Sequence, residues 1–144
     1  VRLAWPGWWL GVFVGAAPPA AAQVPDSIPA VVLKENYPNP FYPSTTIPFE
    51  IHPEVCRKGY RPLVRLEVLS VLAEVVGIPT VAVTVPQPLN GVRLKCGEYK
   101  AYWDGRYVDG EREVTTGVYW VRLVVDGRQY TRKMIVQRRV TSTR

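Results

Sequence analysis

The chain has 144 residues and a formal net charge of +6. A chain of this length forms one domain around one core, and it buries about two thirds of its unfolded surface. The sequence contains no nucleophile motif, no phosphate-binding loop and no carboxylate pair with a reason for a shifted pKa. It therefore predicts a non-catalytic protein without a cofactor.

Residues 1–22 have the pattern of a secretory signal peptide. Arg2 precedes an apolar run over residues 3–17, and Ala20 and Ala22 form a small-residue cleavage site before Gln23. An uncleaved membrane anchor is the alternative, because residues 3–22 barely reach the length of a membrane span, but Pro6, Pro18 and Pro19 argue against it. We expect export, no stable transmembrane span after cleavage, and a short linker over residues 23–32. We do not expect nucleic acid as a partner, because no reading motif is present.

Cys56 and Cys96 are the two cysteines of the chain. An even count in an oxidising compartment predicts a disulfide. A metal site would need more ligands than these cysteines and His52, and a thiol nucleophile would need a positioned base. A solvated or hydrogen-bonded role suits His52 better than metal binding.

Residues 33–46 form a segment with three prolines and two asparagines, which we call the proline-rich segment. Proline fixes φ and disfavours helix at the preceding residue, so we expect this segment to be stiff and extended. We also expect it to present Tyr37 and Phe41 to the core, with its asparagines bonded to nearby backbone groups.

After this segment, apolar residues alternate with polar ones at the spacing of half-buried strands. The alternating sets are Ile47, Phe49 and Ile51; Val64, Leu66 and Val68; Val81, Val83 and Val85; Tyr99, Ala101 and Trp103. Asp126-Gly127 predicts a two-residue hairpin turn between strands over residues 118–125 and 130–136. No helical stripe is present. The sequence predicts an all-β, Ig-like antiparallel two-sheet sandwich of about seven strands over residues 33–137, with Trp103 and Tyr119 in the core, and a basic tail over residues 138–144.

Four ordered motifs resemble the type A C-terminal sorting domain of the type IX secretion system, a family related to the Ig-like domain of the flagellar hook-capping protein. The first motif lies in the proline-rich segment, the second spans residues 68–76, the third joins a Trp-Asp-Gly turn to the next strand, and the fourth is the last strand. Matching residues of the first and third motifs are Asn36, Tyr37, Pro38, Asn39, Pro40, Phe41, Trp103, Asp104, Gly105, Gly117, Val118 and Tyr119. Ala73 stands where the family usually has glycine, and residues 56–62 and 77–95 are longer than the usual loops.

The resemblance implies an Ig-like sandwich that outer-membrane secretion machinery recognises through its last strand and basic end. The residues implied are Thr131, Arg132, Lys133, Met134, Arg138 and Arg139. It further implies passage through the periplasm to the outer membrane surface or the cell exterior. Whether the domain delivers a cargo or is itself delivered stays open.

Other interpretations of the same residues are possible. The chain is alternatively a structural or adhesive module that binds other cell-surface proteins. The basic C-terminal end suits an anionic glycan, and Tyr102 and Trp120 suit an outward sugar-stacking platform. Asp104, Asp109 and Glu111 share one loop and suit calcium, although turn chemistry explains them as well.

Overall fold

The computed structural model describes residues 2–4, 7, 11, 15 and 28–139. The predicted cleavage site, most of the predicted signal peptide and residues 140–144 lie outside the described residues. Among the residues described, no helix is long and apolar enough to cross a membrane.

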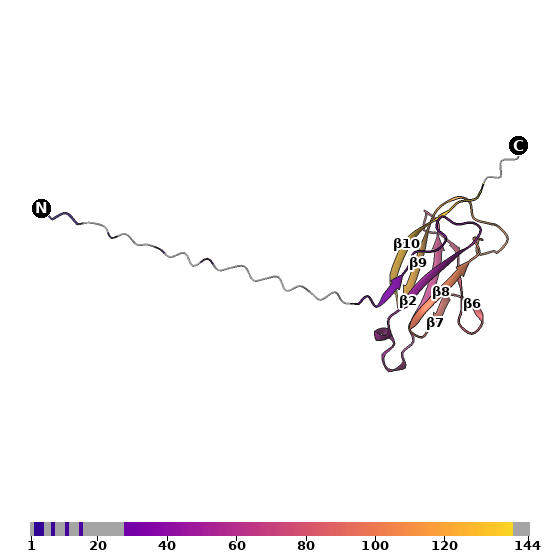
Figure 1. The fold of residues 1–144 in the computed structure, drawn as a ribbon, viewed down its shortest axis with the longest axis horizontal. Helices are drawn as coiled ribbons and strands as arrows, with labels where there is room; N and C mark the ends of the chain where they lie inside the picture. Colours follow the sequence, from indigo (N-terminus) through magenta and orange to yellow (C-terminus); the bar gives the residue numbers. More distant parts are fainter. Residues whose placement is uncertain (1, 5–6, 8–10, 12–14, 16–27, 140–144) are drawn as a thin grey trace.

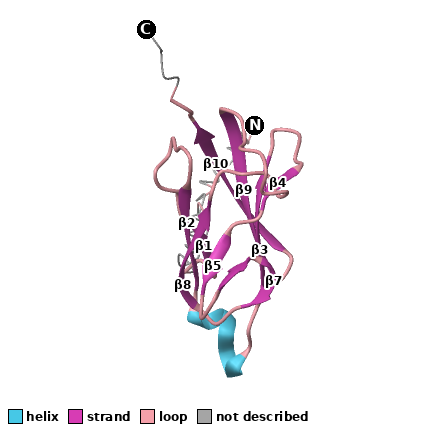
Figure 2. Cartoon of the chain, turned by 90° about the vertical axis from the view of Figure 1, so that its right-hand side faces the viewer, coloured by secondary structure: helices cyan, strands magenta, loops and turns pink. Residues whose placement is uncertain are grey.

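The described chain is an antiparallel two-sheet sandwich (Figures 1 and 2). One sheet has the strand order β1-β2-β8-β5-β6, and the other has the order β10-β9-β3-β4, with β7 paired to β3. The strands are β1 (Val31–Leu33), β2 (Thr45–Ile51), β3 (Leu63–Leu69), β4 (Val75–Gly77), β5 (Thr80–Ala82), β6 (Pro86–Pro88), β7 (Asn90–Arg93), β8 (Gly97–Trp103), β9 (Gly117–Val125) and β10 (Arg128–Val136). The all-β sandwich is therefore confirmed.

The core lies between the sheets and is built by the alternation of the sequence. Ile47, Phe49 and Ile51 on β2 are fully buried, as are Val64, Leu66 and Val68 on β3. On β9, Tyr119, Val121, Leu123 and Val125 are buried, and Trp103 joins them from β8, so Trp103 and Tyr119 lie in the core as predicted. Successive strand residues point to opposite faces, so these sets meet in one apolar layer.

The hairpin between β9 and β10 forms at the predicted turn. Val125 pairs with Arg128, which leaves Asp126 and Gly127 as the two loop residues. Both have positive φ, 48° for Asp126 and 82° for Gly127. Aspartate followed by glycine is the pair that tolerates this turn geometry best.

The described residues form ten strands because short strands, most of them at the edges of the sheets, accompany the long ones. β1 begins at Val31, so the last two residues of the predicted linker belong to the sandwich. The prediction of one strand through Val81, Val83 and Val85 is wrong. The chain bends at residues 83–85, and Val83 and Val85 are exposed. Alternation cannot distinguish a strand from a hairpin whose loop also carries valines.

A short 3₁₀ segment, η1 (Pro53–Gly59), interrupts the all-strand pattern between β2 and β3. Proline lies in its first turn, and the His52 ring nitrogen Nδ1 accepts a hydrogen bond from the Glu54 amide, 3.3 Å away. Cys56 within this segment forms the predicted disulfide with Cys96, with a Cα–Cα distance of 5.9 Å. His52 is thus a capping residue.

Candidate functional site

The proline-rich segment curls over one end of the sandwich and does not run straight. It bends at residues 38–40 and 42–43, and Tyr37 bridges back to Thr46. Phe41 is buried, as predicted, but Tyr37 is half exposed. The prediction for Tyr37 is wrong because the bends turn successive residues in different directions, so the two aromatic side chains do not share a face.

The buried Asn36 side chain stabilises the bent conformation of the segment through hydrogen bonds. This buried side chain donates from Nδ2 to the Pro38 carbonyl at 3.1 Å and to Thr45 Oγ1 at 3.0 Å. Thr45 Oγ1 in turn donates to the same Pro38 carbonyl at 3.0 Å. A buried amide must find partners, so these bonds stabilise one conformation of the segment. The expected local role of this asparagine is observed.

The same segment joins the end of β10. The Phe41 amide donates to the Ile135 carbonyl at 2.9 Å, and the Gln137 amide donates to the Phe41 carbonyl at 3.0 Å. The Asn39 side chain accepts from the Ile135 amide at 3.0 Å. Residues at the two ends of the domain therefore form one surface, which we call the terminal corner (residues 36–43 and 135–139).

The Trp-Asp-Gly turn supports this corner from β8. The Trp103 ring packs edge-on against Phe41, with centroids 5.7 Å apart, and against Tyr119, with centroids 6.3 Å apart. Its indole Nε1 donates to the Arg106 carbonyl at 3.0 Å, and Asp104 accepts from the Arg106 amide at 3.0 Å. Asp104 thus shapes the turn, and Trp103 anchors it to the core.

Gly105 and the start of β9 complete the support. A Cβ on Gly105 would lie 2.1 Å from the Pro43 carbonyl oxygen, and its φ is 73°. The Tyr119 hydroxyl donates to the Thr115 carbonyl at 2.9 Å, a contact like the tyrosine corner of Ig-like domains. Gly117 and Val118 begin β9 and pair with Val136 and Ile135. The residues of the first and third motifs therefore lie around one end of the sandwich.

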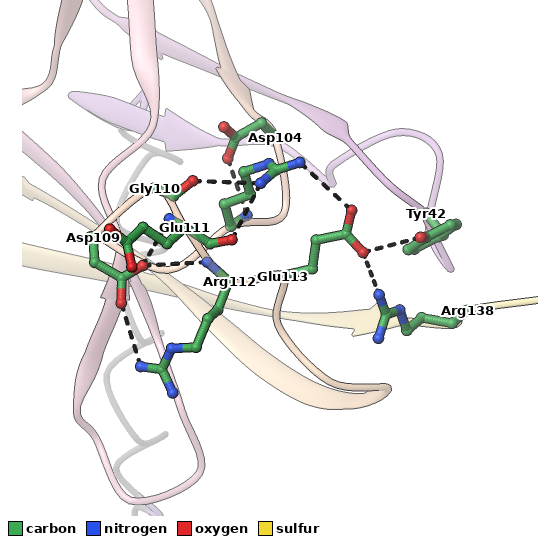
Figure 3. A network of polar contacts seen from close by, with 9 residues as sticks. Tyr42, Asp104, Asp109, Gly110, Glu111, Arg112, Glu113 and Arg138 are labelled. Carbon is green, nitrogen blue, oxygen red and sulfur yellow. Dashed lines mark hydrogen bonds and ion pairs between the residues drawn. The ribbon is translucent and has the colours of Figure 1, made fainter.

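A polar network covers the corner. Glu113 accepts from the Tyr42 hydroxyl at 3.0 Å, pairs with the Arg138 guanidinium, and lies 3.8 Å from Arg106 (Figure 3). The bonds from Tyr42 and Arg138 lower the pKa of the Glu113 carboxyl. The Arg138 guanidinium also lies over the Tyr42 ring, 5.4 Å from its centroid. Sequence reasoning missed Glu113 and Arg106 because nothing in their spacing indicates a partner at the C-terminal end.

The six residues implied as a recognition surface divide into different groups. Thr131, Arg132 and Lys133 are exposed on β10. Met134 is fully buried in the core, so its side chain does not belong to that surface. Arg138 is held by Glu113, and both Arg138 and Arg139 line a groove of about 920 Å³ with Tyr42 and the prolines of the corner.

Two alternative sites do not assemble. Asp104 and Asp109 accept hydrogen bonds from backbone amides of their own loop, and the described residues contain no group of three ligands placed for a metal ion. Tyr102 and Trp120 do not form one platform. Both are exposed, but Tyr102 lies on β8 and Trp120 on β9, so they face outward from different sheets on opposite sides of the sandwich.

Comparisons of the chain with protein-family models, with curated proteins and with solved structures find no match. The resemblance to the sorting-domain family therefore rests on the motifs of the chain itself.

Proposed function

We propose that the chain is a non-catalytic, exported Ig-like domain of the type A sorting class. Export machinery of the outer membrane recognises it and directs it through the periplasm to the outer membrane surface or the cell exterior. The observation that supports this proposal most is the terminal corner. Its hydrogen bonds bring the first family motif together with Arg138 and Arg139, two of the implied recognition residues, although the bonded residues Asn39 and Ile135 stand 96 positions apart.

The corner suits recognition of a folded domain. Its backbone is fixed by hydrogen bonds at Phe41, Gln137 and Ile135, while Tyr42, Arg138 and Arg139 line an open groove. A partner therefore meets a shape that exists before binding, which reduces the entropy cost of association. The guanidinium groups provide charge-assisted hydrogen bonds to a partner.

The test is surface delivery in a bacterium that carries type IX machinery. The double substitution Arg138→Ala/Arg139→Ala lies beyond the last residue of β10, so the sandwich folds while the corner loses its cations. We expect the variant to accumulate in the periplasm, as measured by cell fractionation and by protease accessibility on intact cells. Wild-type chain should reach the surface in the parent strain and remain in the periplasm of a strain without the machinery.

A matched control places the same change at the other end of the molecule. Arg57 and Lys58 form an adjacent basic pair in η1, which lies at the end of the sandwich opposite the end of β10 (Figure 2). Arg57→Ala/Lys58→Ala should leave delivery unchanged. Normal delivery of the corner variant, or equal loss in both variants, would refute recognition at the corner.

A further inference from the structure

A second groove lies beside β10 and shares no lining residue with the groove at the terminal corner. It has a volume of about 470 Å³ and is lined by residues of β10, by Trp120 of β9 and by Leu33 of β1. The β10 residues are Tyr130, Thr131, Arg132 and Lys133. We call it the seam groove, because β1 and β10 belong to different sheets.

The register places an aromatic ring beside a cation in this groove. Trp120 and Lys133 are direct cross-strand partners, and both side chains point away from the core. Side chains in such a pair lie within contact distance of each other. On the other side of Trp120, its partner on β3 is Leu69, which is buried although it faces outward. In the strand register, Trp120 therefore stands between an apolar neighbour on β3 and a lysine on β10.

The charge of the groove is unbalanced. Arg65 and Arg122 on the same outer face both pair with Glu67, but no ion pair within the described residues includes Lys133. Arg132 uses Nε to donate to the Leu33 carbonyl at 2.5 Å, and its guanidinium is otherwise exposed. The groove is lined by two cations, two aromatic side chains, a threonine and a leucine, with no carboxylate.

We propose that the seam groove binds an acidic saccharide, with a uronate sugar as the chemical class. The sugar ring stacks on the exposed face of Trp120, and its carboxylate accepts a charge-assisted hydrogen bond from Lys133 on the same outer face. Arg132 projects from the opposite face of β10, where it bonds the Leu33 carbonyl, and it adds positive charge at the rim of the groove. This site does not depend on the proposed export role.

An acidic extended peptide is the competing occupant, because β10 is the edge of its sheet. Contacts within the domain already occupy part of this edge. Phe41 pairs with the far end of β10, and the Arg132 side chain links its middle to β1. An inward-pointing charge on an edge strand also opposes the addition of another strand. These contacts favour a ligand held by side chains.

The probe is a short oligogalacturonate, titrated into the full chain and followed by the NMR signals of the Trp120 indole and the Lys133 side chain. We expect saturable shifts that weaken with added salt. The fully methyl-esterified oligomer has the same rings without charge and should bind at least tenfold more weakly. An acidic peptide of equal charge should not compete. Equal binding of the ester, or stronger binding of the peptide, would overturn the proposal.

Variants locate the site. Trp120→Ala should abolish the shifts, and Lys133→Gln should reduce affinity about tenfold, the usual scale for one charged hydrogen bond. The matched control is Tyr102→Ala with Lys100→Gln, an exposed aromatic and lysine on the outer face of β8, where Glu98 and Glu50 supply negative charge. The control should bind as the wild type does. If the control loses as much affinity as the groove variants, the assignment to this groove is wrong.

Thermal unfolding of each variant separates lost binding from lost folding. If Trp120→Ala does not fold, Lys133→Gln alone decides the question, because its exposed side chain contributes nothing to the core. A folded Lys133→Gln variant with unchanged affinity would exclude the groove as the binding site.

Discussion

Gly105 is the residue at which the Trp-Asp-Gly turn touches the proline-rich segment. A methyl group there meets the Pro43 carbonyl at 2.1 Å, and the positive φ adds strain for any residue with a Cβ. We expect Gly105→Ala to lower the free energy of unfolding by about 3 kcal/mol or more, since strain and overlap add.

Gly110 provides the matched control for this change. It has the same φ of 73° in the same loop, but no atom lies within 4 Å of the position of its Cβ. Gly110→Ala should therefore cost only the backbone strain, about 1 kcal/mol. Denaturant unfolding of both variants measures the difference. Equal losses would mean that the contact with Pro43 contributes nothing.

Ala73 carries strain that glycine would relieve. The family that the motifs resemble usually has glycine at this position. The structure places Ala73 at φ 60° in the turn between β3 and β4. We expect Ala73→Gly to stabilise the protein by roughly 0.5 kcal/mol, because the relieved strain exceeds the added freedom of the unfolded chain. Leu72→Gly in the same turn lacks that strain and should destabilise. A loss of stability in Ala73→Gly, measured by denaturant unfolding, would contradict this account.

The stability of the terminal corner depends on pH through the Glu113 carboxyl. Bonds from Tyr42 and Arg138 lower the pKa of Glu113, so the folded state favours the carboxylate. The stabilisation is fully present above the ordinary glutamate pKa and is lost as pH falls through the lowered folded value. We expect the Gln137 amide, which bonds Phe41, to exchange faster below that pH, while at neutral pH it stays protected.

Hydrogen exchange followed by NMR between pH 7 and pH 3 measures this opening after correction for the intrinsic exchange rate. Glu113→Gln should weaken the protection at neutral pH and remove its pH dependence. Glu111→Gln changes an exposed carboxylate of the same loop and should leave the response intact. Persistence of the response in Glu113→Gln would assign it to another group. Because the network is exposed to solvent, the loss of exchange protection should be confined to the corner, and the free energy of global unfolding should change little.

The long strands and the hairpin could be predicted, because alternation and Asp-Gly chemistry are local. Ile47, Phe49 and Ile51 are buried through a period of two, which needs no knowledge of distant residues. The terminal corner could not be predicted, because Asn39 and Ile135 are brought together by the whole sandwich. Alternation also showed that Tyr102 and Trp120 point outward, but it could not assign them to different sheets.

At the scale of the whole molecule, the disulfide joins two connecting segments, each of which crosses from one sheet to the other. Cys56 lies in η1, between β2 of one sheet and β3 of the other, and Cys96 lies between β7 and β8, which also belong to different sheets. The bridge closes a loop with a sequence separation of 40. In the chain-entropy account, a loop of this length stabilises the fold by about 4 kcal/mol by restricting the unfolded chain.

We therefore expect Cys56→Ser/Cys96→Ser to lose about 4 kcal/mol of unfolding free energy, measured by denaturant titration. Wild-type protein under reducing conditions should show the same loss, whereas the double variant should not respond to reductant. The corner lies at the opposite end, so the Gln137 amide should keep its place in the spectrum of the folded variant (Figure 2). A loss of unfolding free energy below about 1 kcal/mol would mean that the two connecting segments stay close together in the unfolded chain even without the bridge.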